Sequence, residues 1–368
     1  MQLLVPSAYG LEAVVKRQLA LLGYPDTRAL DGRIIVENAD WTDVARINMF
    51  VRSGERVLVR LAEFAAETFD QLFDGIKSIR WADYVSPHGK ITVITKTVDS
   101  ALTAHHAIQS IGKKAIVSAF GTLPEDGEEY VVELAFSKNV CSVNLDTSGV
   151  GLHKRGYRTL AYTAPLKETT AAALVDLSVW NPDKMFTDLF CGSGTLPIEA
   201  ALKALKIAPG INRSFAYQNW VTVPANAYEL ALAEAKDVAV MRQLNIIGAD
   251  INPKAIEIAN FHATQAGVAD FVKFNVRAAE NFISRSSYGV NVSNPPYGER
   301  IGNADEVQQT AKNMGKLYRS LDKWNFYFLS PYQDFEKDFG RRADKKRYIF
   351  NAGIKCSYYT FCGPKPKK

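Results

Sequence analysis

The stretch Asn294-Pro295-Pro296-Tyr297 follows an apolar run that begins near residue 288. Two consecutive prolines rule out both helix and ladder pairing at this point. The side-chain oxygen of Asn294 and the backbone carbonyl of Pro295 can accept the two hydrogens of an exocyclic amine, and proline adds no competing donor. Tyr297 can stack on the base that carries the amine. We therefore predict Asn294, Pro295, Pro296 and Tyr297 as the catalytic residues for methylation of a planar amine, a reaction governed by positioning and local dipoles.

A second candidate site is a glycine-bearing turn between a predicted strand and a predicted helix. Its glycines let the backbone approach a ligand closely, and the helix that follows offers free N–H groups and a positive dipole end. A nucleotide-like ligand fits such a turn. The residues expected to hold it are Asp188, Phe190, Cys191, Gly192, Ser193, Gly194 and Thr195, and Asn294 is also counted among the cofactor-binding residues.

The spacing after this turn separates two cofactor classes. A nicotinamide fingerprint needs a third small residue for helix packing and an acid about 20 residues further on, whereas here Pro197 follows the turn and the next strand-end acid is Asp250. NAD is therefore a much weaker candidate for the cofactor than a methyl donor. Asp250, with Ile251 beside it, can take both ribose hydroxyls of a nucleoside, and Asn281 can accept from an adenine amino group.

The candidate residues lie in a part of the sequence where predicted helices alternate with apolar predicted strands. Such alternation predicts a parallel, doubly wound sheet, with both candidate sites at the carboxyl ends of its strands. A hairpin whose turn lies at 351–353 is expected to close the chain. The predicted strands are 185–190, 245–249, 271–276, 290–293 and 324–330, and the predicted helices are 167–180, 195–206, 253–266 and 305–322.

In the N-terminal part, the sequence pattern predicts two small α+β units instead. Residues Asp40 and Thr68 each begin a capping-box pattern, and Gly23 stands where a helix-ending glycine belongs. The first unit combines strands at 3–5, 33–36 and 56–64 with helices at 11–22 and 41–51. The second unit combines strands at 90–98, 130–136 and 140–145 with a helix from 69 and a helix at 103–120.

Composition restricts the class of protein further. The 368 residues are 47% hydrophobic and exceed what one core usually supports, so two or three domains are expected. No apolar run is long enough for a membrane span, and the four scattered cysteines suggest neither disulfides nor a metal site. A cytoplasmic protein without metal is expected. The net charge of +5 arises in the C-terminal part, because residues 1–153 are net acidic; such an excess permits contact with a polyanion without establishing it.

With these residues in view, the chain resembles the THUMP-domain RNA methyltransferases, and most closely the bacterial 23S ribosomal RNA guanine-N2 methyltransferases. The resemblance covers nearly the whole chain. It rests on five motifs in order, at 152–158, 164–168, 188–195, 250–252 and 294–297. One catalytic domain is covered, so one reaction is expected.

The resemblance implies an α/β fold of defined organisation. It places a ferredoxin-like domain at 1–60, a THUMP domain at 61–155, a linker at 156–166 and a Rossmann-like class I methyltransferase domain at 167–368, with a parallel sheet and a C-terminal antiparallel hairpin. S-adenosyl-L-methionine is the implied cofactor, and 207–244 is the insertion that follows the first helix of the catalytic domain.

The resemblance also implies further contacts. Segment 164–169 would lie over the methionine end of the cofactor, with Lys167 and Glu168 as its polar groups. Relatives commonly carry an aspartate where this chain has Asn281. Structured RNA, with 23S ribosomal RNA first, is the expected partner. Its candidate contacts are Arg52, Arg56, Lys113, Lys114, Lys154, Arg155 and Arg158, with a denser basic run at Arg341, Arg342, Lys345, Lys346 and Arg347.

The leading hypothesis is methyl transfer from S-adenosylmethionine to the N2 amine of a guanine in RNA. Methylation of a transfer RNA guanine or of adenine N6 is the nearest alternative, because Asn-Pro-Pro-Tyr describes an exocyclic amine and does not name the base. An RNA-binding ribosome assembly factor without turnover is the alternative from another class. The oligomeric state is left open.

Overall fold

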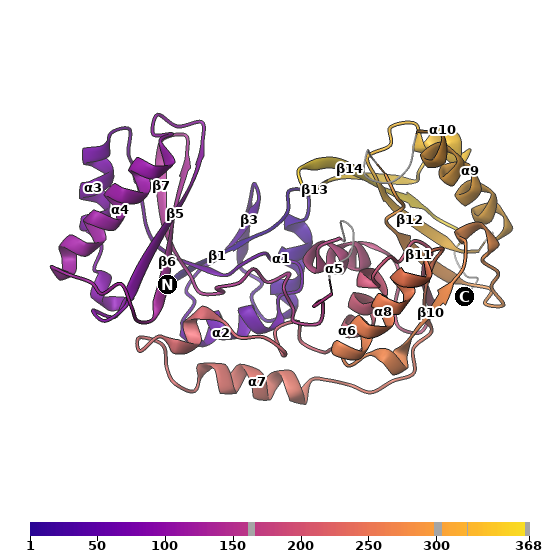
Figure 1. Ribbon diagram of the computed structural model, residues 1–368, viewed down its shortest axis with the longest axis horizontal. Coiled ribbons are helices and arrows are strands. Elements are labelled where there is room, and N and C mark those ends of the chain that lie inside the picture. Colours follow the sequence, from indigo (N-terminus) through magenta and orange to yellow (C-terminus); the bar gives the residue numbers. More distant parts are fainter. Residues whose placement is uncertain (161–165, 298–303, 322, 365–368) are drawn as a thin grey trace.

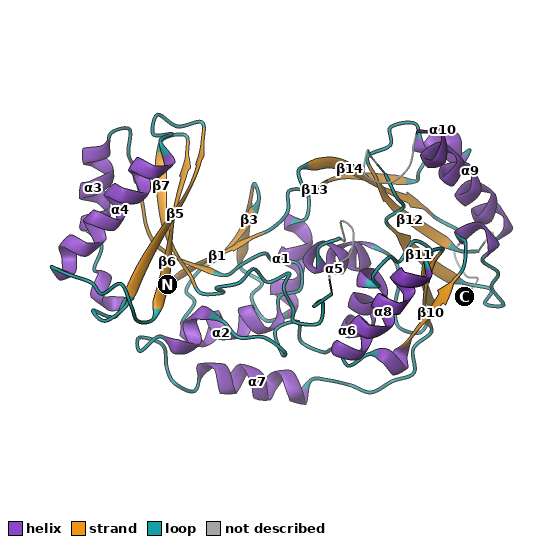
Figure 2. Cartoon of the chain, viewed as in Figure 1, coloured by secondary structure: helices purple, strands orange, loops and turns teal. Residues whose placement is uncertain are grey.

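The computed structural model describes residues 1–160, 166–297, 304–321 and 323–364. They form two seven-stranded sheets, one in each half of the chain (Figure 1). Figure 2 shows helices packed beside both sheets and long loops crossing between the halves. Among the described residues, no helix combines the length and the apolar character needed to cross a membrane.

The N-terminal sheet has the strand order β2-β3-β1-β4-β7-β6-β5. Strand β4 pairs with β1 on one side and with β7 on the other, so the two expected α+β units share one continuous sheet, and residue 60 falls inside β4. Its strands are β1 (Gln2–Pro6), β2 (Thr27–Leu30), β3 (Arg33–Val36), β4 (Leu58–Ala65), β5 (Lys90–Val98), β6 (Glu129–Ser137) and β7 (Val140–Asp146).

Two helices of this half begin where their sequence signals stand. Asp40 and Thr68 each form a capping box, as predicted, and Gly23 has a φ of +96° just beyond the first helix. The helices are α1 (Glu12–Leu21), α2 (Trp41–Phe50), α3 (Phe69–Lys77) and α4 (His105–Phe120).

The C-terminal sheet has the order β10-β9-β8-β11-β12-β14-β13. The first five strands run parallel, and the last two form the predicted antiparallel hairpin, which turns at Ala352 and Gly353 with φ of +50° and +82°. The strands are β8 (Met185–Asp188), β9 (Ile246–Asp250), β10 (Val272–Val276), β11 (Gly289–Ser293), β12 (Asn325–Ser330), β13 (Lys345–Asn351) and β14 (Ile354–Phe361).

Helices α5 (Glu168–Leu177), α6 (Thr195–Ala204), α8 (Pro253–Gln265), α9 (Ala304–Ser320) and α10 (Phe335–Phe339) complete this half. Strands β8 and β11 are neighbours at the point where the strand order reverses, and ligands of open α/β sheets bind at such a point, beyond the carboxyl ends of the strands. All residues of β8 and β11 are buried, which fits central strands of a parallel sheet.

The segment at 207–244 packs against the N-terminal half. Its helix α7 (Ala227–Asp237) lies beside α2 (Figure 1). Arg46 on α2 donates from Nε and Nη2 to the two carboxylate oxygens of Glu234 on α7, both at 2.7 Å. The buried ring of Trp220 stacks on Tyr130 of β6 at 4.7 Å. The insertion therefore joins the two halves.

Candidate functional site

The glycine turn follows directly from the end of β8. Gly192 and Gly194 have φ of +52° and +86°, a region in which side chains are disfavoured. A Cβ at Gly194 would lie 2.9 Å from the Phe274 ring and 3.0 Å from the Ala259 methyl group. The turn therefore excludes larger residues, and α6 begins at Thr195 with its first N–H groups at the same end of the sheet.

Asp250, at the end of β9, holds this turn in place. Its Oδ2 accepts from the Gly192 N–H at 2.9 Å, and its Oδ1 accepts from the Asn252 N–H at 2.9 Å. Each carboxylate oxygen can accept more than one hydrogen bond, so the group retains capacity for ribose hydroxyls. Beside it, the Ile251 side chain is 74% exposed and offers an apolar surface to a ligand.

Asp188 is a buried acid beneath the turn. Burial raises its pKa to about 7; the Phe190 N–H and Ser293 oppose this shift, and nearby Asp250 adds to it. The Ser293 hydroxyl accepts from the Leu189 N–H at 3.0 Å and so ties the end of β11 to the residue after β8. The carboxyl ends of the two central strands are thereby fixed against each other.

Asn294 follows Ser293 and offers a hydrogen-bond acceptor at the end of β11. Its Oδ1 is buried and has no hydrogen-bond partner among the described residues. A buried acceptor without a donor costs free energy. The preceding strand holds it at the switch point, and the buried Pro295 behind it contributes a backbone carbonyl and no N–H. The arrangement can accept hydrogens from a ligand amine.

Tyr297 is half-buried, and its hydroxyl faces the C-terminal hairpin. It accepts from Asn351 Nδ2 at 2.9 Å, with Cys356 Sγ at 3.9 Å. Burial and the neighbouring Cys356 raise its pKa to about 12. The phenol is therefore neutral near pH 7 and cannot serve as a base, and stacking of a base on its ring stays a prediction.

The structure ties Lys167 and Glu168 to other partners. Lys167 is exposed, and its Nζ lies 3.2 Å from Glu55 Oε2 in the N-terminal half. Glu168 is buried and pairs with Arg158 at 3.2 Å; burial raises its pKa, although Arg158 lowers it. Lys167 therefore faces the N-terminal half, and contact of either residue with a cofactor stays a prediction. Residues 164 and 165 lie outside the described part of the chain.

The other predicted cofactor residues differ in their exposure to solvent. Cys191, Ser193 and Thr195 are buried, Phe190 is partly buried, and Asn281 is exposed as the last residue of a short helix at Ala279–Asn281. His262, on α8, was not predicted. Its Nδ1 lies 3.1 Å from the Ser193 carbonyl oxygen and supports the turn as a donor, and burial lowers its pKa.

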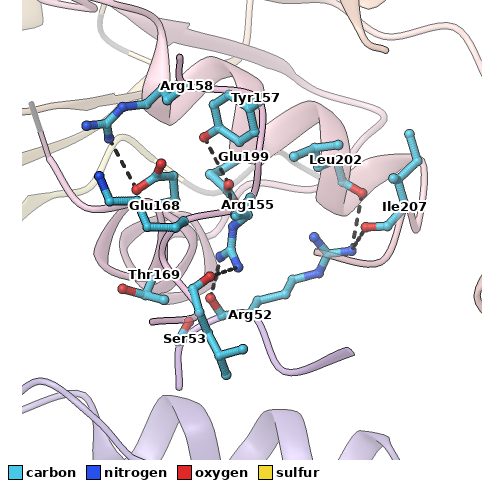
Figure 3. A network of polar contacts seen from close by, with 12 residues as sticks. Arg52, Ser53, Arg155, Tyr157, Arg158, Glu168, Thr169, Glu199, Leu202 and Ile207 are labelled. Carbon is cyan, nitrogen blue, oxygen red and sulfur yellow. Dashed lines mark hydrogen bonds and ion pairs between the residues drawn. The ribbon is translucent and has the colours of Figure 1, made fainter. Parts of the chain in front are cut away.

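Two of the predicted RNA contacts are wrong. Arg155 is 3% exposed and pairs with Glu199 of α6 at 2.8 Å, while the Tyr157 hydroxyl donates to the same carboxylate at 3.1 Å (Figure 3). Arg52 donates from Nη2 to the Ile207 carbonyl at 2.6 Å, and burial lowers its pKa to about 10. Both guanidinium groups lie inside the contact between the two halves and are closed to RNA.

The remaining basic candidates differ in accessibility. Arg158 is bound to Glu168, Arg56 pairs with the buried Asp146, and Lys113 pairs with Glu125 at 3.0 Å. Lys114 and Lys154 are exposed. Arg341 pairs with Asp344 at 2.8 Å, Arg347 donates to the Gly10 carbonyl at 3.1 Å, and Arg342, Lys345 and Lys346 are exposed.

A groove between the halves contains a cluster that the sequence did not reveal. It has a volume of about 510 Å³, and its lining includes Glu55, His153, Lys167 and Asn351. Burial favours protonation of Glu55, but His153, Thr169 and Lys167 outweigh it and lower its pKa to about 2. These residues are far apart in the sequence and have no shared spacing, so only the fold brings them together. Among the described residues, no three potential metal-binding side chains gather at one point.

The chain has the fold of a Rossmann-like methyltransferase. This fold is defined by the strand order, the glycine turn after β8 and the acid Asp250 at the end of β9. The profile of the RMKL-like methyltransferase domain matches residues 155–360, that of the RlmL ferredoxin-like domain matches 2–58, and that of the THUMP domain matches 66–146. The chain belongs to the RMKL-like methyltransferase family, which confirms the resemblance found in the motifs.

Curated relatives include one of similar length and several longer ones. The Bacillus subtilis protein YpsC, provisionally named an RNA methyltransferase, is 41% identical over 98% of this chain and 95% of its own length. The ribosomal RNA large subunit methyltransferase K/L of Shewanella frigidimarina is 31% identical over 86% of this chain and 46% of its own. This chain thus spans about half the length of the K/L relatives.

Two solved structures share the whole architecture. A Listeria monocytogenes protein, described as a predicted N6-adenine-specific DNA methylase, is 41% identical with a TM-score of 0.93 and covers 99% of this chain and 96% of its own. The methyltransferase SMU.472, so assigned provisionally, was crystallised with S-adenosylhomocysteine; it is 38% identical with a TM-score of 0.94 and covers 100% of this chain and 99% of its own. That ligand agrees with the predicted cofactor.

Proposed function

We propose that this protein transfers a methyl group from S-adenosylmethionine to the exocyclic N2 amine of a guanine in RNA, with 23S ribosomal RNA as the first candidate substrate. The observation that carries the proposal is the unpaired, buried Oδ1 of Asn294 beside the glycine turn. The THUMP profile at 66–146, YpsC and the K/L relatives support RNA and a cytoplasmic site of action.

The residues of the site fit the cofactor. The glycine turn leaves backbone exposed to a ligand, Asp250 can accept from ribose hydroxyls, and Ile251 offers an apolar surface to an adenine ring. When bound, S-adenosylmethionine supplies an electrophilic methyl group. No metal is required for this chemistry.

Asn294 and Pro295 perform the positioning step. The Asn294 Oδ1 and the Pro295 carbonyl each accept one amine hydrogen, which fixes the plane of the base and directs the nitrogen lone pair out of that plane. Their dipoles favour the positive charge that develops on nitrogen as the new bond forms. The alkylated nitrogen is then a strong acid and loses its proton to water, so the neutral Tyr297 phenol is not needed as a base.

The proposal predicts that Asn294→Ala lowers methylation at least about a hundredfold, in line with the loss of one preorganised group. S-adenosylmethionine affinity, measured by calorimetry, stays within about twofold. Asn226→Ala is the matched control, because that amide is exposed on the insertion and distant from the turn. Unchanged turnover by Asn294→Ala would overturn the mechanism.

The base is tested separately, because the Listeria relative's description favours adenine N6 as the second candidate. Ribosomal and transfer RNA from cells lacking the protein is incubated with the purified protein and labelled cofactor, and its nucleosides are analysed by mass spectrometry. Label in N2-methylguanosine of 23S RNA supports the proposal. Label in N6-methyladenosine contradicts the proposed base, and label in transfer RNA alone contradicts the proposed substrate. Absence of label from all RNA favours an assembly factor.

A further inference from the structure

The outward face of the β13–β14 hairpin exposes aromatic rings next to cations. Alternate residues of a strand share a face, and in β13 this alternation brings Lys346, Tyr348 and Phe350 outward while Ile349 is buried. Tyr348 is 53% exposed and Phe350 is 41% exposed. Exposed rings close together are unusual on a surface that contacts only water.

Neighbouring residues extend this surface across both halves of the molecule. Tyr9, 55% exposed, packs edge-on against Phe350 with ring centroids 5.7 Å apart. The Lys355 ammonium lies 4.5 Å from the centre of the Tyr348 ring. We define Tyr9, Lys346, Tyr348, Phe350 and Lys355 as the hairpin face.

The charge of the hairpin face is positive. Lys346 has one acidic neighbour, Glu336, at 3.4 Å. Within the described part of the chain, no carboxylate pairs with Lys355. The two lysines that line the groove differ from Lys355, since Lys167 pairs with Glu55 and Lys96 with Glu133. The hairpin face is therefore the better complement to phosphate.

The hairpin also contacts the catalytic motif. Asn351, the last residue of β13, donates to the Tyr297 hydroxyl at 2.9 Å, and Phe350, Asn351 and Ala352 line the groove between the halves. A strand of RNA on the hairpin face would thus lie on an element that contacts Tyr297 of the catalytic motif.

We propose that the hairpin face binds an unpaired stretch of the RNA substrate, with bases stacked on Tyr348 and Phe350 and phosphates beside Lys355 and Lys346. Stacking requires bases that are not already stacked in a duplex. The same condition applies to the target base, which must leave its helix to reach a buried acceptor. This inference rests on the proposed function for the identity of the polymer as RNA.

The test compares affinities of the full-length protein for a fluorescein-labelled single-stranded oligoribonucleotide of mixed sequence and for the same strand annealed to its complement. Tyr348→Ala and Phe350→Ala each weaken single-strand binding about tenfold, the size of one lost base–aromatic stack, and change duplex binding by less than about twofold. Lys355→Glu makes the dependence of log affinity on log salt shallower by about one unit.

The controls are Met241→Ala, which removes another exposed apolar side chain, and Lys236→Glu, which reverses a charge on α7. Unchanged single-strand affinity in the hairpin variants, or equal losses for strand and duplex, would overturn the proposal. A change of molar mass in light scattering with RNA affinity intact would assign the face to contact between copies and also overturn it. Binding needs no turnover, so this result stands even where mass spectrometry identifies another methylated base.

Discussion

At the scale of single residues, Asp188 makes the cofactor turn sensitive to pH. An acid whose pKa is near 3.8 in the unfolded chain and about 7 when folded binds its proton more tightly in the native state. Its contribution to stability is therefore largest below about pH 4 and is lost as the pH rises through about 7. The burial that raises this pKa is the same burial that holds the ends of β8 and β11 together.

Asp188→Asn should remove this dependence, because the amide keeps an acceptor for the Phe190 N–H and does not ionise. The free energy of unfolding of the variant minus that of the wild type should rise by roughly 4 kcal/mol between pH 4 and pH 7.5, measured by urea denaturation. Asp183→Asn, at an exposed acid, is the control. A pH-independent difference would contradict the pKa assigned to Asp188.

The position of a site residue in the fold could be predicted from the sequence where the signal is local. Gly192, Asp250 and Asn294 stand directly after apolar runs, so their place at the strand ends follows from the pattern. Arg52 and Arg155 could not be assigned in this way, because a basic residue looks the same in sequence whether it faces solvent or a carboxylate. The partner of Arg155 is Glu199, on a helix whose packing only the fold determines.

At the scale of elements, a buried polar network joins α6 to the N-terminal half (Figure 3). Arg155 donates to Glu199 from Nε and to the Leu152 carbonyl from Nη1 at 3.1 Å, and its Nη2 bonds the carbonyl of Arg52. The Glu199 side chain is fully buried. Each charge is tolerated in the interior because the other compensates it.

Arg155→Met should therefore lower the free energy of unfolding by about 3–5 kcal/mol, since it leaves the buried Glu199 carboxylate without its cation. Arg155→Met combined with Glu199→Gln should recover part of this loss, because the amide carries no charge and still accepts from Tyr157. Arg80→Met, in an exposed pair with Asp83, should cost less than about 0.5 kcal/mol. A double variant as unstable as the sum of its single changes would show that the pair is not coupled.

Element prediction succeeded where capping or periodicity was strong. The capping boxes of α2 and α3, the Pro253 start of α8 and the turn of the hairpin are confirmed. Strand β2 and helix α7 were not predicted. Three of the four residues of β2 are exposed, and α7 begins without a side-chain cap, so neither carries a clear pattern.

At the scale of the whole molecule, the insertion at 207–244 belongs structurally to both halves. It leaves the catalytic domain after α6, crosses α2 and returns to the β9 strand. The Gly210 N–H donates to the Met49 carbonyl at 2.9 Å, and Val240 N–H donates back to the Leu205 carbonyl at 2.9 Å. The sequence identified this segment as an insertion through family resemblance, but its contact with the N-terminal core depends on long-range packing that local patterns do not encode.

Trp220 is the main apolar anchor of this insertion. It is 3% exposed, stacks on Tyr130, and donates from Nε1 to the Glu129 carbonyl at 3.3 Å. Trp220→Ala should cost about 3–5 kcal/mol as a large-to-small core change. It should also make the insertion the first site cut in limited proteolysis, because local opening there no longer breaks the stacking contact.

The adjacent Val221 provides the matched control, since its side chain is 74% exposed and Val221→Ala removes apolar atoms without removing the anchor. Mass spectrometry of the fragments locates the cuts, and thermal denaturation reports the global stability. Cuts confined to 207–244 together with a lower Tm would support the anchoring role of Trp220. A lower Tm with cleavage elsewhere would contradict this role and mean that Trp220 stabilises the N-terminal core without anchoring the insertion.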